Sequence, residues 1–500
     1  GVLLYDSTDV TPDAAALSAR RITPVGVPMT SLTIETLGGS GKQKGKNIFL
    51  LGLLTRIFKL DQKRVKKLLE EKFAGKNESI LRSSMLALDA GYAYSIGDLM
   101  ALYSFEAPTG KTARQVTMNG NQALAYGCIA AGIRFGAGYP ITPWTEVMEQ
   151  LRESLPAYGG SFIQTEDELA AVSAALGAAY GGTLSMTGSS GPGISLKSEA
   201  ISYAVMAEIP LLIVDVQRGG PSTGLPTNVE QSDFQIAVHG GHGDSPRLVV
   251  APGNVEDCFY LVIEAVRLAA RYRLPVIFLS DQSLATRIEA FELPDIAARF
   301  NPPPQRPESV PSYKPYALEL PSDLTAPPGT RIESGEYPNI TGLEHDAMGH
   351  PSANGKVHAA MTARRREKLS AIARELPPLE VYGPDHGDLL LVGWGSTRGV
   401  IREAVDRAAT QGRTLSALHL RYLNPLPLEL EAIFNAYHRV VVVEMNDADP
   451  LTGLGQLGRH LRGTLCLRHI TGLTKTDGLS FRVREILEGL PNPATAAMES

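Results

Sequence analysis

Cysteine is scarce in this sequence, which has only three in 500 residues: Cys128, Cys258 and Cys466. They lie far apart, and no C-x-x-C pair occurs. Disulfide frameworks and iron–sulfur clusters need several cysteines at regular spacing. We therefore expect neither a disulfide framework nor an iron–sulfur cluster held by this chain alone.

Long basic runs and long apolar runs are also missing. The net charge is −6, with 47 Lys and Arg against 53 Asp and Glu, and this small acidic excess argues against a nucleic-acid partner. No apolar stretch reaches the roughly 18 residues that a membrane span needs. The chain shows no signal peptide and opens in a strand-like run at residues 1–5. We expect a cytoplasmic protein with no membrane contact, and a natural chain that begins further upstream.

What the sequence has instead is a series of glycine- and proline-rich turns between residues 132 and 224. Each turn follows a short apolar run of strand length and precedes a helical pattern. Turns at such places meet at the carboxyl edge of a parallel sheet, where ligands bind. The sequence therefore predicts one ligand crevice, built from four turns: Gly138–Pro143, Gln164–Glu168, Ser189–Gly193 and Gln217–Gly224.

The length predicts about three domains. Alternating strand and helix patterns over 116–295, and again over 385–490, indicate an α/β fold with doubly wound parallel sheets. Residues 1–115 form a further unit with three helical patterns, and 296–384 form a proline-rich crossing segment. The helices expected in the first α/β domain are Asn121–Ala131, Trp144–Ser154, Glu168–Tyr180, Ile194–Ala207 and Val255–Arg271.

Two clusters of basic residues lie outside the turns. The helix predicted at Ala359–Glu375 carries three consecutive arginines at 364–366, which we interpret as a solvated helix face. The loop Gly38–Asn47 contains Lys42, Lys44 and Lys46 but lacks the Ser or Thr and the upstream Gly of a P-loop. Two interpretations of this loop stay open: a solvated loop, or an anion site at the start of the next helix.

Two further motifs imitate known sites. Gly393–Gly399 has the spacing G-x-G-x-x-x-G, and no acidic residue ends the next strand, so we do not predict a nicotinamide site. His239, His242 and Asp244 lie close in sequence but lack a third ligand at a recognisable spacing. We therefore predict no metal bound by this chain.

Glu168 is the first candidate for chemistry. It follows the apolar run Ser161–Gln164 and opens an alanine- and glycine-rich helix, whose small side chains let a flat ring approach closely. Glu166, Asp167 and Glu168 crowd one helix start, where carboxylates also cap the helix and complement its dipole. Both roles stay open for Glu168.

Arg218 and Thr142 are the second and third candidates. Arg218 ends a strongly apolar strand and can hold a substrate carboxylate in a bidentate pair. The alternative is a structural arginine bound to Asp215 or to a backbone carbonyl. Thr142 offers a hydroxyl within a stiff Pro-Ile-Thr-Pro turn, and the alternative is a turn residue only.

These motifs, taken in order, resemble the alpha subunits of the 2-oxoacid:ferredoxin oxidoreductases, in the form where a gamma domain precedes alpha. The fused architecture is most similar to 2-oxoglutarate:ferredoxin oxidoreductase, and the first hundred residues resemble only the second half of a gamma domain. The motifs that carry the resemblance are Gly138–Pro143, Asp167-Glu168, Thr187–Gly193, Gln217–Gly224, Gly342–Asp346 and Leu420–Pro427.

The resemblance implies a thiamin diphosphate enzyme whose cofactor lies between two chains. Residues 116–295 are similar to the pyrimidine-binding domain of that superfamily, and 385–490 to transketolase C-terminal domains. A beta subunit would supply Mg²⁺, a [4Fe-4S] cluster and the diphosphate contacts, in a heterotetramer of two alpha and two beta chains. The reaction implied is oxidative decarboxylation of 2-oxoglutarate to succinyl-CoA, or its reverse, with coenzyme A as a substrate and ferredoxin as the electron partner.

The resemblance also assigns roles to residues. Glu168 falls on the glutamate that contacts N1′ of the cofactor's aminopyrimidine, and Ile141 and Tyr139 fall beside the ring. Thr142 and Arg218, together with Ser222 and Thr223, fall on substrate-contacting positions.

Two alternatives stay open. Many relatives carry an arginine before a Pro-Gly-Thr turn, whereas here Arg331 follows that turn at 328–330. The substrate is therefore 2-oxoglutarate or, alternatively, pyruvate, a branched-chain or an aryl 2-oxoacid. A second alternative is a non-catalytic scaffold subunit, in which loss of the glutamate is expected; this chain keeps Glu168.

Overall fold

The computed structural model describes residues 1–38, 45–75, 78–97, 113–295, 307–320 and 325–490. The chain divides into two compact units, Gly1–Thr112 and Ala113–Ser500.

The first unit combines a two-stranded parallel sheet with a small group of helices around an apolar core. Helix α4 begins where Asp61 accepts hydrogen bonds from the backbone N–H groups of residues 63 and 64, and α3 and α5 pack closely against each other. The three helices expected here are confirmed. The elements are β1 (Val2–Asp6), α1 (Ala14–Ala19), β2 (Thr23–Val27), α2 (Met29–Leu37), α3 (Lys46–Ile57), α4 (Gln62–Phe73) and α5 (Glu78–Ala93).

The lysine loop of this unit is described only in part. Lys42 and Lys44 lie outside the described residues. Lys46 forms ion pairs with Asp6 at 3.1 Å and Asp9 at 3.4 Å. Its charge is thus already matched by carboxylates of the same unit, which favours the structural interpretation for this lysine.

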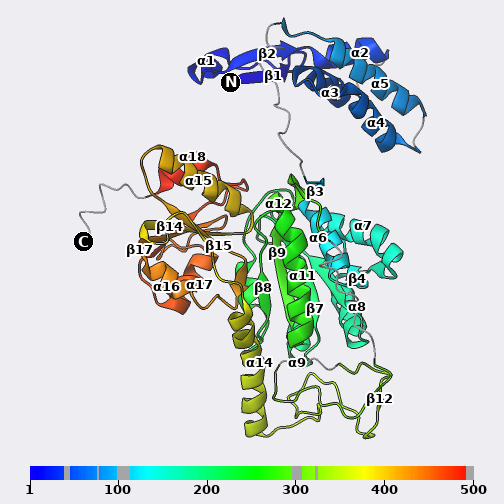
Figure 1. Cartoon of the computed structure of the whole chain (residues 1–500), viewed down its shortest axis with the longest axis vertical. Coiled ribbons are helices and arrows are strands. Elements are labelled where there is room, and N and C mark those ends of the chain that lie inside the picture. The colour runs from blue at the N-terminus through cyan, green and yellow to red at the C-terminus, as the bar shows by residue number, and fades with distance from the viewer. Residues whose placement is uncertain (39–44, 76–77, 98–112, 296–306, 321–324, 491–500) are drawn as a thin grey trace. The chain divides into compact units, whose positions relative to one another are not determined.

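The second unit is built on a seven-stranded sheet in the order β16-β8-β9-β7-β6-β4-β5, parallel except for β16 (Figure 1). Strands β7 and β9 are apolar runs buried along their whole length, as expected for a parallel sheet covered on both faces. Its strands are β4 (Phe135–Gly138), β5 (Ser161–Gln164), β6 (Ser185–Ser189), β7 (Leu211–Gln217), β8 (Leu248–Val250), β9 (Pro275–Asp281) and β16 (Tyr422–Asn424). A separate antiparallel pair joins β3 (Gln115–Asn119) to β10 (Ile288–Glu292).

Helices cover both faces of this sheet, so the predicted doubly wound α/β fold is confirmed. One face packs against α6 (Gly120–Ala130), α7 (Thr145–Ser154) and α11 (Val255–Tyr272). The other packs against α8 (Glu168–Tyr180), α9 (Gly191–Met206) and α10 (Phe234–His239). The strand order reverses between β4 and β6, because β4 connects outward to β5 whereas β6 connects to β7 on the other side. Ligands in such sheets bind at this switch point, outside the carboxyl ends of the strands.

The C-terminal part has a second sheet in the order β13-β15-β14-β17-β18. Its glycine turn at 393–399 is packed against the first sheet: Gln231 Nε2 donates to the Trp394 carbonyl at 2.8 Å, and the Ser396 backbone N–H donates to Asp281 at 3.1 Å. The turn therefore has a structural partner where a dinucleotide phosphate would lie. The elements are β13 (Val381–Tyr382), β14 (Gly387–Trp394), α15 (Arg398–Thr410), β15 (Ser416–Leu420), α16 (Leu430–Asn435), β17 (Tyr437–Glu444), α17 (Gln456–Leu465), β18 (Ile470–Thr474) and α18 (Val483–Gly489).

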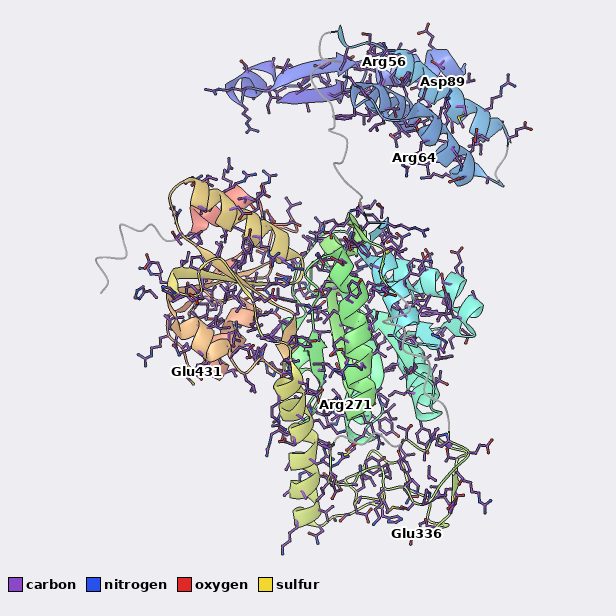
Figure 2. All side chains as sticks on the ribbon, in the orientation of Figure 1. Arg56, Arg64, Asp89, Arg271, Glu336 and Glu431 are labelled. Carbon is purple, nitrogen blue, oxygen red and sulfur yellow. The ribbon has the colours of Figure 1, made fainter. Side chains whose placement is uncertain are left out.

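The crossing segment lies beyond the amino ends of the sheet strands (Figure 1). In Figure 2, Arg271 in the last turn of α11 lies next to this segment, and Glu336 lies on its far side. It contains β11 (Ser309–Val310) and β12 (Arg331–Ile332) and leads into the long helix α14 (Gly355–Glu375). The expected helix at Ala359–Glu375 is thus confirmed, with a longer N-terminal end.

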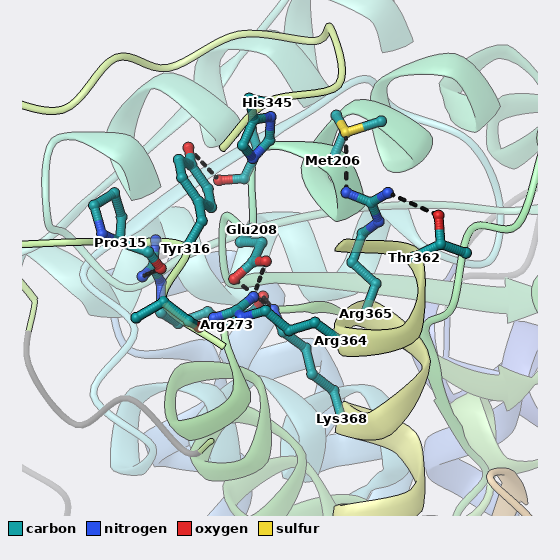
Figure 3. A network of polar contacts seen from close by, with 12 residues as sticks. Met206, Glu208, Arg273, Pro315, Tyr316, His345, Thr362, Arg364, Arg365 and Lys368 are labelled. Carbon is teal, nitrogen blue, oxygen red and sulfur yellow. Dashed lines mark hydrogen bonds and ion pairs between the residues drawn. The ribbon is translucent and has the colours of Figure 1, made fainter. Parts of the chain in front are cut away.

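The interpretation of the arginine run as a solvated face is wrong for two of its three members. Arg364 and Arg365 are 4% and 5% exposed, and only Arg366 faces solvent. Arg364 and Lys368 both pair with the buried carboxylate of Glu208, as Figure 3 shows. Burial opposes ionisation of Glu208, but the charges of Lys368, Arg364 and Arg273 lower its pKa to about 2. This network fixes α14 to the amino ends of the strands.

Candidate functional site

The four turns predicted to form a crevice lie at one edge of the seven-stranded sheet. They follow β4, β5, β6 and β7, four neighbouring parallel strands whose carboxyl ends point the same way. The turn after β4 and the turn after β6 flank the switch point. The prediction that these four turns share one edge of the sheet is confirmed. Ligand binding at that edge, where open α/β sheets hold their ligands, stays a prediction.

The three carboxylates at the start of α8 have separate positions. Asp167 is the N-cap, and its side chain accepts the Ala170 N–H at 2.7 Å. Glu166 is exposed. Glu168 is 9% exposed, and among the described residues none donates a hydrogen bond to its carboxylate. Asp167 therefore performs the capping that was one alternative for Glu168, which leaves the Glu168 carboxylate available to a ligand.

Gly193, in the first turn of α9, brings the helix close to Glu168. A Cβ at this position would lie 1.9 Å from Ser189 Oγ and 2.9 Å from Glu168 Cγ, so no side chain fits there without displacing both. The hydroxyls of Ser189 and Ser190 are buried without a hydrogen-bond partner among the described residues. Unpartnered buried donors are uncommon in folded proteins, and these two lie beside the buried carboxylate.

Arg218 and Thr142 are brought together from 76 residues apart. Arg218 Nη1 donates to the Thr142 carbonyl at 2.7 Å, which matches the backbone-carbonyl alternative and not a pair with Asp215. The guanidinium keeps one edge unbonded, because Nε is buried without a partner and Nη2 takes no bond from a described residue. Nε and Nη2 together form the edge that binds a carboxylate side-on. A structural bond and an unbonded guanidinium edge therefore coexist in one side chain.

The carboxyl groups of Asp233 and Glu230 lie near the Arg218 side chain and its loop. Burial lowers the pKa of Arg218, and the charge of Asp233 opposes that shift. Burial and the neighbouring charge of Glu230 raise the pKa of Asp233 to about 7. Glu230 accepts the Gly220 N–H at 3.1 Å and holds the loop that follows the arginine.

The other predicted site residues lie on the same loops with more exposure. Tyr139 and Thr142 are exposed and Ile141 is partly buried, after β4. Ser222 and Thr223 are exposed in the loop after β7, where Ser222 has a positive φ of 56°. Figure 1 places both loops at the carboxyl end of the sheet.

Two buried groups near the site were missed by the sequence analysis. Lys197 on α9 and Asp215 on β7 are both 0% exposed. The Lys197 ammonium and both Asp215 oxygens lack hydrogen-bond partners among the described residues. A usable sequence signal was present for Asp215, which interrupts an otherwise apolar strand.

The remaining candidates lead elsewhere. The His239 ring packs against His460, with ring centroids 5.3 Å apart, and within the described ranges no three His, Cys, Asp or Glu side chains gather as a metal site. A cavity of about 710 Å³ lies at the opposite, amino edge of the sheet, lined among others by Pro210, Arg273 and Thr330. It is remote from Glu168, so its size does not make it the reaction site.

The residues at this sheet edge fit the aminopyrimidine of thiamin diphosphate on two structural grounds. A buried carboxylate without a protein donor suits a ring nitrogen that exchanges a proton with it. The start of α9 packs so close to this side chain at the switch point that a Cβ on Gly193 would lie 2.9 Å from Glu168 Cγ. The unbonded edge of Arg218, held near Thr142, suits the carboxylate of an acidic substrate.

Family models match three stretches of the chain. Residues 126–363 match "Pyruvate flavodoxin/ferredoxin oxidoreductase, thiamine diP-bdg". Residues 1–94 match "Pyruvate ferredoxin/flavodoxin oxidoreductase", and residues 387–486 match "Pyruvate:ferredoxin oxidoreductase core domain II". Within the described residues, no helix is both long and apolar enough to cross a membrane.

Curated relatives and a solved structure extend the similarity. The 2-oxoglutarate oxidoreductase subunit KorA of Mycobacterium tuberculosis is 40% identical over 486 residues, with 92% of this chain and 71% of the relative covered. The 2-oxoglutarate synthase subunit KorA of Methanothermobacter marburgensis is 37% identical, with 74% and 96% covered. The structure of 2-oxoglutarate:ferredoxin oxidoreductase from Magnetococcus marinus, with 2-oxoglutarate, coenzyme A and succinyl-CoA bound, is 34% identical. It aligns with a TM-score of 0.85 over 97% of this chain and 83% of that one.

Proposed function

This chain belongs to the alpha subunits of the 2-oxoacid:ferredoxin oxidoreductases, and on that premise we propose that it carries out the oxidative decarboxylation of 2-oxoglutarate to succinyl-CoA, or the reverse. The observation that carries the proposal is the buried carboxylate of Glu168, which opens α8 at the switch point of the sheet. Asp167, and not Glu168, caps that helix. A scaffold subunit would have no need for an unpartnered buried carboxylate. In this assignment residues 1–115 are part of a gamma domain, 116–295 bind the pyrimidine, and 385–490 form the transketolase C-terminal-like domain.

Glu168 acts as the acid–base group in this proposal. Thiamin diphosphate, when bound, supplies the carbon nucleophile that attacks the 2-oxoacid. Glu168 contacts the ring nitrogen N1′ and exchanges a proton with it through its carboxyl oxygen. Ile141 and Tyr139, on the loop after β4, border the ring, and Gly193 keeps the carboxylate in place.

Arg218 and Thr142 orient the substrate. The Nε and Nη2 edge of Arg218 binds the C1 carboxylate, while the Nη1 bond to the Thr142 carbonyl keeps the guanidinium plane fixed. The Thr142 hydroxyl, with Ser222 and Thr223 on the facing loop, contacts the carbonyl end. A fixed arginine loses less conformational freedom on binding than a mobile one.

A partner subunit completes the site. Beside the crevice, Tyr139, Ile163, Leu169 and Leu196 are 38%, 41%, 52% and 53% exposed, and exposed apolar side chains on neighbouring elements favour a protein partner. We assign to a beta subunit the diphosphate contacts, the Mg²⁺ and the [4Fe-4S] cluster that passes electrons to ferredoxin, in an assembly of two alpha and two beta chains.

The assignment of 2-oxoglutarate as the preferred 2-oxoacid rests on the relatives, which are named as enzymes of 2-oxoglutarate. Arg331 is exposed on β12 and adjoins the cavity residue Thr330 at the amino edge, so within one chain it does not reach the Glu168 crevice. If 2-oxoglutarate is the substrate, a cation other than Arg331 of the same chain binds its distal carboxylate.

Turnover with a panel of 2-oxoacids tests the proposal. The chain is produced with its beta subunit, and ferredoxin reduction is followed with 2-oxoglutarate, pyruvate, a branched-chain and an aryl 2-oxoacid, each with coenzyme A. We expect the highest kcat/KM with 2-oxoglutarate. A preference for pyruvate would move the assignment to that substrate, and no turnover with any 2-oxoacid would leave the scaffold alternative.

A further inference from the structure

A row of polar side chains lies under α8 and α9, on a sheet face that is otherwise apolar. On β6, Thr187 and Ser189 alternate with Met186, which packs into the core on the opposite face. On β7, Asp215 alternates with Val214 in the same way. Because side chains alternate between the faces of a strand, the two polar sets point toward α9. Thr187, Ser189 and Asp215 are each 0% exposed, and none has a side-chain hydrogen-bond partner among the described residues.

Lys197 is the cation that enters this row. It follows Gly193 by four residues, so both lie on the same face of α9, and Gly193 contacts Glu168. Side chains on a helix lean toward its N-terminus, which aims the Lys197 ammonium back along α9 toward Glu168. The two groups form no direct pair within 4.0 Å, so they interact through the low-dielectric interior.

The electrostatics agree with this placement. Burial lowers the pKa of Lys197 to about 8, while the charges of Glu168, Asp215 and Asp167 oppose the shift, with Glu168 the largest of the three. Burial and the charge of Asp233 raise the pKa of Asp215. A raised pKa means that Asp215 holds its proton more strongly than a free aspartate does, which weakens it as a counter-ion for the Lys197 ammonium.

We propose that Lys197 is a positioning residue for the proton transfer at Glu168, because its buried ammonium stabilises the ionised carboxylate. This inference rests on the role proposed for Glu168 and goes beyond it. An opposite charge nearby favours the charged form of a carboxyl group. With Lys197 beside it, Glu168 more readily leaves its proton with the ring nitrogen that it contacts. Asp167 from α8, Asp215 from β7 and Asp233 from α10 complete the titratable groups around the row.

The test replaces Lys197 with Met, which has similar length and no charge. Thiamin diphosphate binding to the complete two-subunit enzyme is measured by titration calorimetry from pH 5 to 9, in buffers of different ionisation heat, so that proton uptake on binding is obtained as well. In Lys197→Met we expect the midpoint of the pH dependence of cofactor binding to rise by about one pH unit. Turnover should fall while KM for the 2-oxoacid stays the same, because Lys197 does not touch the substrate. Lys197→Arg, which keeps the charge, should restore most of the wild-type profile.

Matched variants separate this role from structural damage. Lys368→Met removes the other buried lysine, at the opposite edge of the sheet, and should leave the pH profile of binding unchanged. In a Glu168→Gln background, Lys197→Met should add no further shift, since the group it acts on is gone. Where Lys197→Met does not fold, Lys197→Gln takes its place, with thermal unfolding as the check.

Each outcome decides the proposal. Two results would overturn the role of Lys197 and leave that of Glu168 intact. One is a shift of the pH profile by Lys197→Met that persists in the Glu168→Gln background. The other is a pH profile of binding that Lys197→Met leaves unchanged. If Glu168→Gln itself leaves binding and turnover unchanged, the proposed function fails instead, and the two failures are thereby distinguished.

Discussion

Asp167 and Glu168 are adjacent in sequence, yet the structure predicts opposite effects for their replacement. Asp167 caps α8 through a 2.7 Å bond to the Ala170 N–H, and Glu168 is buried with no hydrogen-bond donor from the part of the chain that the structure describes. Asp167→Ala should therefore cost stability with little loss of turnover. Glu168→Gln should keep stability and lose turnover, because the amide preserves shape but cannot exchange the proton.

The magnitudes follow from these contacts. Loss of an N-cap side chain costs about 1 kcal/mol, which in a unit of this size lowers the unfolding midpoint by about 2 °C or less. Loss of a general acid–base group lowers turnover by about 10²–10⁴-fold. Thermal unfolding of the purified chain gives the first quantity, and 2-oxoacid-dependent ferredoxin reduction with the beta subunit gives the second.

Two results with these variants would contradict the roles assigned to Asp167 and Glu168. If Asp167→Ala abolishes turnover while Glu168→Gln does not, the two carboxylates have been assigned the wrong way round. If neither affects turnover, the crevice at the switch point is not the reaction site. Glu166→Gln, at an exposed position in the same turn, is the control and should change neither quantity.

Three further outcomes are expected. Arg218→Lys keeps the charge but loses the Nε and Nη2 edge, so kcat/KM should fall about 10–150-fold, as expected for a lost charge-assisted bond of about 1.5–3 kcal/mol, for every 2-oxoacid tested. Selective loss of 2-oxoglutarate activity alone would show that Arg218 binds the distal carboxylate instead. The pKa of Glu208 is lowered from 4.5 to about 2, so its contribution to stability is complete above about pH 4.5 and is lost as the pH falls toward 2. Glu208→Gln should remove that acid-sensitive component and destabilise the fold by about 3–5 kcal/mol, because Arg364 is left buried without its partner; acid titrations followed by circular dichroism measure both effects. The chain purified alone should show no iron–sulfur absorbance, since two of its cysteines are buried and the third is exposed far along the chain, and stoichiometric iron and sulfide on this chain alone would contradict that.

Much of the fold was predictable because strand and helix periods are local properties of the sequence. The alternation over 116–295 gave the elements of a parallel sheet, and the turns after its strands gave the edge on which the site lies. The division of labour between Asp167 and Glu168 was not predictable, since only the packing of α9 through Gly193 decides which carboxylate is buried. Two adjacent carboxylates look alike in sequence, even when one caps the helix and the other is buried.

Long-range pairing explains what the sequence analysis got wrong. Arg364 resembles a solvated residue in its local charge pattern, and its burial depends on Glu208, which lies 156 residues earlier. Lys197 was missed for a related reason. Its burial depends on the strands beneath α9, and no local pattern separates a buried lysine from an exposed one in a helix of mixed composition.

Strand β16 ties the last part of the chain to the first sheet of its unit. Tyr422 and Asn424 pair antiparallel with β8, which would otherwise present unpaired backbone groups at the sheet margin. An uncovered edge of that kind invites pairing with other chains. A chain cut near residue 385 would therefore leave β8 at an uncovered margin of the first sheet unless the second part bound back to it. The two α/β parts therefore share a sheet edge, although each part also has a sheet of its own.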